Sequence, residues 1–271
     1  PLRAKPGERP IAVSTDGYEF HAGDNNRLRE DTLQRFALQR SGRYRFWSLS
    51  WEDVETAFLP DSEPESYMSS LLPPNLDLQN KLLGNEAFAC RDLNHRNSFA
   101  LLCDLLTRGR DWQWQRYALS LVLGLPKRQR LSAQSIVSRW KSTFPVAVQL
   151  PIPEGESNLS SIESALFSVD ALLSDGFASS LGAGIAAADV SLPIVIASFD
   201  DRTPHASTPD HKKYWRDFLR AMNLLQFLPG SIVLSTKAWE DPVLPTWLAL
   251  GARPASGLWG DLAQELDPVF L

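Results

Sequence analysis

The chain of 271 residues is 44% hydrophobic and 22% charged, a composition typical of a globular protein with a sizeable core. Its net charge of −5 at pH 7 argues against a uniformly basic nucleic-acid binder, and no apolar run approaches the roughly 20 residues that cross a bilayer. The two cysteines, Cys90 and Cys103, indicate a reducing compartment. We therefore predict a cytoplasmic protein with no membrane partner.

Residues 1–58 are predicted to form one strand-helix-strand segment. Hydrophobic patterning predicts a strand, a helix and a second strand over residues 11–15, 25–40 and 44–49. Gly42 is expected to end the helix. Ser50 and Asp53 have the spacing of a capping box, so a further helix is predicted to begin near Trp51.

Residues 59–145 are predicted to form a helical insertion beside the sheet. Four prolines and many polar residues indicate a linker or surface excursion over residues 59–80. Three helical patterns follow over about residues 97–107, 112–124 and 132–143. The basic run of residues 127–130 comes directly after Pro126, and we expect it on an exposed turn.

The same insertion combines positive charge with aromatic side chains. Between Arg108 and Lys141 there are eight basic residues and one acid, interleaved with tryptophan and tyrosine. Because phosphates attract Lys and Arg while unpaired bases stack on aromatic faces, this mixture favours DNA as a partner. The predicted DNA-binding residues, including basic residues of the first segment, are Arg27, Arg35, Arg43, Arg45, Trp112, Trp114, Lys127, Arg128 and Arg130. The alternative is a helical bundle whose tryptophans face the core and whose arginines face water.

Residues 146–271 are predicted to complete the sheet. Strands are expected over residues 146–150, 193–199 and 231–236, and helices over residues 160–173 and 210–228. Asn223 and Gln226 flank the apolar face of the last helix and are expected to hydrogen-bond neighbouring backbone. The predicted fold is α/β, with one central sheet that contains the strands near 11–15, 44–49, 194–199 and 231–236.

Two clusters of ionisable residues follow predicted strands, where open α/β sheets usually place their ligands. The second cluster consists of Asp200, Asp201, His205, Asp210 and His211. These residues could hold a metal ion at the end of a strand. We favour the alternative of a solvated loop in which Asp210 caps the following helix. The first cluster follows the strand of residues 11–15. It is the stronger candidate for chemistry.

Carboxylates close together can hold the Mg²⁺ that activates water for phosphodiester cleavage. The catalytic candidates of the first cluster are Asp16, Glu19, His21 and Asp31, with Asp16 and Glu19 as metal ligands. Ser14 stands where a second metal-binding carboxylate would be useful, which favours a vestigial site. A turn in which Asp16 satisfies its own backbone is the alternative.

Residues 10–58 resemble the second half of the very-short-patch-repair-like branch of the PD-(D/E)XK endonucleases. In those proteins an apolar strand runs into Glu-x-Asp-Gly and is followed by a His, an Arg/Asp helix, a Gly and another strand. The matching residues are Asp16, Gly17, His21, Asp31, Arg35 and Gly42. The family's Glu falls on Ser14, and its earlier Asp would lie before Pro1. The resemblance implies a restriction-endonuclease-like mixed sheet flanked by helices, with Mg²⁺ as cofactor only if the site is active.

Residues 11–21, 28–55 and 214–236 together resemble the C-terminal region of large superfamily 2 DEAD/DEAH-box helicases from bacterial anti-phage systems such as Druantia and DISARM. The motor's signatures, Gly-x-x-x-x-Gly-Lys-Ser/Thr and Asp-Glu-x-His/Asp, are not in the sequence, so ATP binding is expected only in the parent protein. The resemblance implies an accessory module that binds DNA or braces motor domains, which lie upstream in the same polypeptide or in a partner chain. The alternatives are an active Mg²⁺-dependent endonuclease and a scaffold that contacts only protein.

Overall fold

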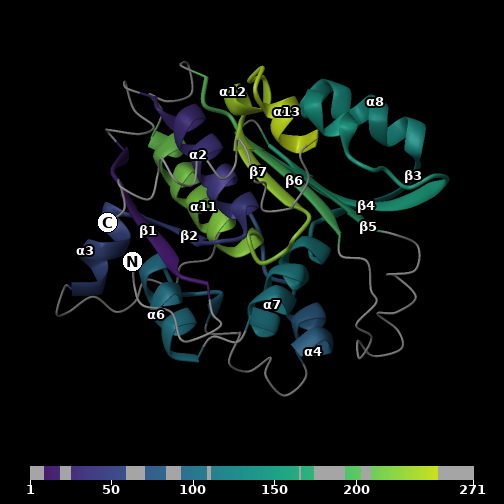
Figure 1. The fold of residues 1–271 in the computed structure, drawn as a ribbon. Coiled ribbons are helices and arrows are strands. Elements are labelled where there is room, and N and C mark those ends of the chain that lie inside the picture. Colours follow the sequence, from purple (N-terminus) through teal and green to yellow (C-terminus); the bar gives the residue numbers. More distant parts are fainter. Residues whose placement is uncertain are drawn as a thin grey trace.

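Two pairs of parallel strands, each joined through a helix, organise the fold (Figure 1). The computed structural model describes residues 9–18, 26–58, 71–83, 93–108, 111–164, 166–173, 193–202 and 209–249. In the first pair, β1 (Ile11–Asp16) lies parallel to β2 (Arg45–Ser50), and α2 (Leu28–Ser41) stands between them in the chain. In the second pair, β6 (Ile194–Phe199) lies parallel to β7 (Ser231–Ser235), with α11 (Pro209–Leu225) between them.

The two pairs belong to different sheets. β1 and β2 form a two-stranded sheet, whereas β6 and β7 belong to a five-stranded sheet with the order β3-β4-β5-β6-β7. Its other strands, β3 (Lys127–Ser132), β4 (Glu156–Glu163) and β5 (Phe167–Leu173), pair antiparallel. The α/β class with a mixed sheet is confirmed. The expectation of one sheet holding all four parallel strands is wrong, because α2 packs beside β7 and α11 packs beside β2.

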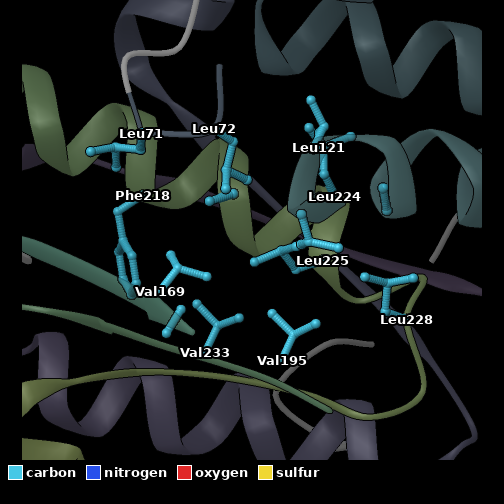
Figure 2. Close-up of a cluster of buried hydrophobic side chains, with 14 of the residues drawn as sticks. Leu71, Leu72, Leu121, Val169, Val195, Phe218, Leu224, Leu225, Leu228 and Val233 are labelled. Carbon is cyan, nitrogen blue, oxygen red and sulfur yellow. The ribbon is translucent and has the colours of Figure 1, made fainter. Parts of the chain in front are cut away.

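Helices cover both faces of the five-stranded sheet (Figure 1). The remaining helices in chain order are α3 (Trp51–Phe58), α4 (Leu76–Leu83), α6 (Ser98–Arg108), α7 (Asp111–Leu123), α8 (Ala133–Thr143), the 3₁₀ helix η2 (Pro145–Gln149), α12 (Thr236–Trp239) and α13 (Leu244–Ala249). α7 and α11 share one core with the sheet, and α2, α8, α12 and α13 share another with its opposite face. Figure 2 shows the first of these cores, where leucines of α11 meet three strand valines, Val169, Val195 and Val233.

β6 illustrates why the central strands read as continuous apolar runs. Val195, Ala197 and Phe199 join the core beneath α11, whereas Ile196 joins the core on the other face. Because side chains alternate along a strand, burial on both faces requires an apolar residue at nearly every position. Burial on two faces accounts for the apolar sequence from residue 193 to 199.

Local chain signals at the ends of helices are confirmed. Gly42 follows α2 with φ of 68°, a left-handed conformation that glycine adopts without steric cost. The Ser50 backbone N–H donates to the Asp53 carboxylate at 3.0 Å, and the Asp53 N–H donates to the Ser50 hydroxyl at 3.1 Å. These reciprocal bonds are the predicted capping box, and α3 begins at Trp51 as expected.

Four predicted elements differ from the structure. Residues 160–173, predicted as a helix, lie in the hairpin of β4 and β5; β5 is an interior strand, so its apolar run has no period of two. Residues 146–150, predicted as a strand, lie mostly in η2, which begins at Pro145, whose fixed φ suits a first helical turn. Residues 127–130, predicted as a turn, are part of β3. The predicted linker of residues 59–80 contains the start of α4, and residues 59–70 lie outside the described part.

Candidate functional site

The carboxyl ends of β1, β6 and β7 meet in one polar region, which we call the carboxyl-edge site. Three hydrogen bonds join segments far apart in the sequence. The Tyr18 hydroxyl lies 2.9 Å from Nδ1 of His211, the Asn26 amide donates to the Asp201 carbonyl, and the Ser235 N–H donates to the Thr32 hydroxyl at 3.3 Å. Strand ends are where α/β proteins commonly bind ligands, so the carboxyl-edge site is a candidate ligand site.

Asp16, the leading catalytic candidate, is buried and paired. Its side chain is 1% exposed, and Oδ1 accepts from Nη2 of Arg35 at 2.6 Å and from the Ser14 hydroxyl at 3.1 Å. The Arg35 guanidinium also lies over the Phe46 ring, 5.2 Å from its centroid. Oδ2 of Asp16 and Nη1 of Arg35 have no hydrogen-bond partner in the described structure. Arg35 therefore supplies the positive charge that a metal ion would bring to this carboxylate.

Of the other predicted catalytic residues, the structure describes only Asp31. Asp31 is half-buried in the first turn of α2, and Glu19 and His21 lie outside the described residues. Within the parts of the chain that the structure describes, no group of three or more His, Cys, Asp or Glu side chains is arranged to hold a metal ion.

A second buried carboxylate, Asp201, lies directly after β6. It is fully buried, and its Oδ1 accepts from the backbone N–H of Lys237 at 3.0 Å. Burial raises the pKa of this carboxyl above its ordinary value, because the charged form loses hydration. Oδ2 finds no partner among the described residues. Asp201 is thus a buried acid without a neutralising cation in hydrogen-bond contact.

His211 connects β6 to the segment that follows β1. Its ring is fully buried, and Nε2 lies 3.3 Å from the carbonyl oxygen of Asp200. Since a carbonyl only accepts, Nε2 carries a proton, and in the neutral ring Nδ1 then accepts from the Tyr18 hydroxyl. Of the second cluster considered from sequence, Asp210 is exposed in the first turn of α11, and His205 lies outside the described residues. No sequence pattern pointed to Tyr18 or Asn26 as part of this site. In the structure, Asn26 has a positive φ of 33°.

The predicted DNA-binding arginines of the first segment do not form one surface. Arg27 and Arg43 are exposed at opposite ends of α2. Arg45 is half-buried, with its guanidinium 4.3 Å from the centroid of the Phe227 ring. Arg35 is committed to Asp16, so its charge is not available to a phosphate in this structure.

Two tryptophans of the basic and aromatic segment, Trp114 and Trp140, lie in the hydrophobic core. Trp114 is 4% exposed and packs against the rings of Trp47, Tyr117 and Phe227. Trp140 is likewise buried, and its indole N–H donates to Asp170. The side chain of Trp112 lies outside the described residues. Trp114 therefore fills the core instead of offering a face to a base.

The basic run of residues 127–130 is exposed on β3, one of the two edge strands of the five-stranded sheet. β3 pairs with β4 on one side, and Figure 1 places both strands at the end of the molecule opposite β1 and α3. Arg128 donates to the Leu123 carbonyl at 2.5 Å, and Arg130 lies 2.8 Å from Glu156 with both side chains about 60% exposed. All four side chains of the run, Lys127, Arg128, Gln129 and Arg130, are exposed.

Comparison with protein-family models, with curated proteins and with solved structures finds no match to this chain. None of the described helices has the length and apolar character to cross a membrane.

Proposed function

We propose that this chain is a DNA-binding accessory module of a DEAD/DEAH-box helicase in anti-phage defence, built on a nuclease-like segment that has lost metal-dependent cleavage. The observation that supports DNA binding best is the exposure of Lys127, Arg128 and Arg130 on the edge strand β3. Arg128 and Arg130 project from one face of the strand and Lys127 from the other, so a phosphate backbone that passes along this edge can reach cations on both faces.

The environment of Asp16 supports the loss of cleavage. Mg²⁺ is bound by carboxylates together with water, and a working site leaves room for both. Here Arg35 occupies one carboxylate oxygen, Ser14 replaces the second carboxylate, and the side chain of Asp16 is almost fully buried. A metal ion would have to compete with the guanidinium at 2.6 Å.

The mode of contact that fits this surface is electrostatic and independent of sequence. Because Trp114 and Trp140 are buried in the core, we assign no stacking role to either. A contact through the three cations of β3 gives a logarithmic salt slope of up to about −2.7 on duplex DNA, since each neutralised phosphate contributes about −0.9.

The test is the binding of a fluorescein-labelled DNA duplex, followed by fluorescence anisotropy at several salt concentrations. Replacing Lys127, Arg128 and Arg130 together with Gln should weaken binding at low salt and flatten the salt slope by about two to three. A matched variant that replaces Arg9, Lys141 and Lys213 with Gln removes the same charge from exposed positions elsewhere. The matched variant should retain most of the wild-type affinity and slope.

Three outcomes would contradict the proposal. Equal loss of binding in the two triple variants would show that β3 is not the specific DNA contact, and no binding by the wild type would favour the protein-only scaffold. Cleavage of the duplex in Mg²⁺ that disappears in Asp16→Ala would favour the active endonuclease. Thermal unfolding followed by circular dichroism establishes that each variant is folded, which matters because Arg128 also bonds the Leu123 carbonyl.

A further inference from the structure

An apolar band runs over the outer faces of α3 and α6. Trp51 and Phe58 are 66% and 71% exposed, the largest exposed fractions among the large hydrophobic side chains that the structure describes, and Leu106 on α6 is 43% exposed. Trp51 and Phe58 are seven residues apart and so share one face of α3; Phe99 and Leu106 share one face of α6 in the same way. We define the apolar band as Trp51, Val54, Phe58, Phe99, Cys103 and Leu106.

The two helices form one continuous surface. The rings of Phe58 and Phe99 lie 5.7 Å apart, so the faces of α3 and α6 meet at this pair. Val54 and Phe99 are half-buried against the main core, which anchors the inner side of the band. A single exposed apolar residue is ordinary, but a contiguous apolar patch on two packed helices is characteristic of a binding surface.

α3 is held firmly in place and is not a loosely attached turn. The capping box fixes its first residue, and Arg216 of α11 lies 3.5 Å from the Asp53 carboxylate. Lys212 of α11 pairs with Glu52 at 2.5 Å. Asn97 donates to the Asp53 carbonyl at 3.2 Å. These contacts leave the apolar side of α3 directed away from α11, preformed for a partner.

The charge along the band identifies the chemistry of that partner. α3 contains three acids, Glu52, Asp53 and Glu55, and no base. Lys212 and Arg216 pair with the first two, whereas Glu55 is exposed on the same side as Trp51 and Phe58. A carboxylate in the middle of the apolar band repels a phosphate backbone and attracts Lys or Arg.

We propose that the apolar band docks an amphipathic helix of a partner protein, with aliphatic residues at i, i+3, i+4 and i+7 and with Lys or Arg beside Glu55. This is the helix-in-groove type of recognition, in which large apolar anchors supply affinity and bordering charges select the partner. The proposal is independent of DNA binding, which is assigned to β3 at the other end of the molecule.

The test uses a fluorescein-labelled amphipathic Leu/Lys peptide of about four helical turns, with leucines at helical spacing. A scrambled peptide of the same composition and a Leu/Glu peptide of the same pattern are the controls. We expect the patterned Leu/Lys peptide to bind the wild type at least about tenfold more tightly than either control, measured by anisotropy.

Variants of the chain locate the binding. Trp51→Ser with Phe58→Ser should weaken binding of the Leu/Lys peptide at least about tenfold, because the anchors are removed. Leu76→Ser with Val243→Ser is the matched control, since both residues are exposed apolar positions outside the band, and it should bind like the wild type. Glu55→Lys should invert the preference, so that the Leu/Glu peptide binds more tightly.

Three results would overturn the proposal. The first is equal binding of patterned and scrambled peptides, and the second is unchanged peptide binding by the Trp51/Phe58 variant. The third is loss of duplex DNA binding in the Trp51/Phe58 variant with peptide binding retained, which would make the band a nucleic-acid contact. Trp51, Phe58, Leu76 and Val243 are all exposed, so the Trp51/Phe58 variant and the Leu76/Val243 control should both unfold within a few degrees of the wild type. A thermal melt verifies this.

Discussion

Two buried carboxylates at the carboxyl-edge site, Asp16 and Asp201, meet different environments. Asp16 is neutralised by Arg35, and this pair also packs on Phe46. Asp201 receives a backbone N–H from Lys237, and its pKa is raised by burial. The two acids therefore affect stability in opposite ways: the first depends on its partner, whereas the second is a cost when it is charged.

At the residue scale, we predict that Asp16 and Arg35 are strongly coupled. Arg35→Met leaves a buried carboxylate without its cation and should lower the free energy of unfolding by about 3–5 kcal/mol, and Asp16→Asn should also destabilise. The double variant should cost clearly less than the sum of the two single changes. Urea denaturation of the four proteins measures this coupling. Additive effects would show that the ion pair contributes little beyond packing.

Asp201 predicts a particular dependence of stability on pH. A carboxyl whose pKa is raised on folding contributes stability that is fully present below its unfolded pKa of about 4 and is lost as pH rises through the folded value. Asp201→Asn imitates the neutral acid at every pH. Its thermal midpoint should therefore exceed that of the wild type at pH 7 to 8, and the difference should shrink toward pH 4. A difference that stays constant with pH would contradict this assignment.

At the element scale, α11 substitutes for a strand beside β2. Asn223 accepts from the Ser48 N–H and donates to the Ser48 carbonyl, both at 2.7 Å, and Gln226 bonds both backbone groups of Phe46. The two amides reproduce the donor and acceptor pattern that a neighbouring strand would present to every second residue. An edge that would otherwise invite pairing with another chain is thereby closed.

This arrangement predicts a large cost for truncating Asn223. Asn223→Ala leaves the N–H and the carbonyl of fully buried Ser48 without partners and should reduce the free energy of unfolding by about 2–5 kcal/mol. Gln39→Ala on α2 is the comparison, because its amide donates to the Ser231 hydroxyl and to no other described group, and it should cost about 1 kcal/mol or less. Chemical denaturation measures both values. Similar costs for the two variants would contradict the strand-like role of Asn223.

Elements specified by nearby residues could be predicted from the sequence, and those specified by distant partners could not. The capping box at Ser50 and the end of α2 at Gly42 depend on contacts within a few residues, and both are confirmed. The β4–β5 hairpin is different. Asp170 is fully buried in β5, where Arg139 and Trp140 of α8 donate hydrogen bonds to its carboxylate. These partners lie about 30 residues away in the sequence, so no local pattern predicts them.

At the scale of the whole molecule, the two parallel pairs exchange helices. α2, which connects β1 to β2, bonds β7 through Thr32 and Gln39, and α11, which connects β6 to β7, bonds β2. Each pair also ends in a serine that caps the following helix, Ser50 for α3 and Ser235 for α12. The molecule thus contains two β-α-β-α units, and the first helix of each unit packs beside a strand of the other.

The same exchange explains why the candidate site could be predicted only in part. Asp16 was found from its place after a strand, but its pairing with Arg35 depends on how α2 turns. The bond between Tyr18 and His211 spans 193 residues and exists only once the two units pack. Asp201 and His211 of the second unit stand out in the sequence because they follow a predicted strand, but that position does not predict their contacts with Asn26 and Tyr18.

The bond between Ser48 and Asn223 has a consequence for biosynthesis. β2 is made 175 residues before the side chain that satisfies its outer backbone groups. At translation rates of about 5–20 residues per second, the nascent strand waits roughly 10–35 seconds with that flank open. During this interval the unpaired backbone groups of β2 are accessible to chaperones or to a neighbouring nascent chain, whereas in the folded protein Asn223 covers them.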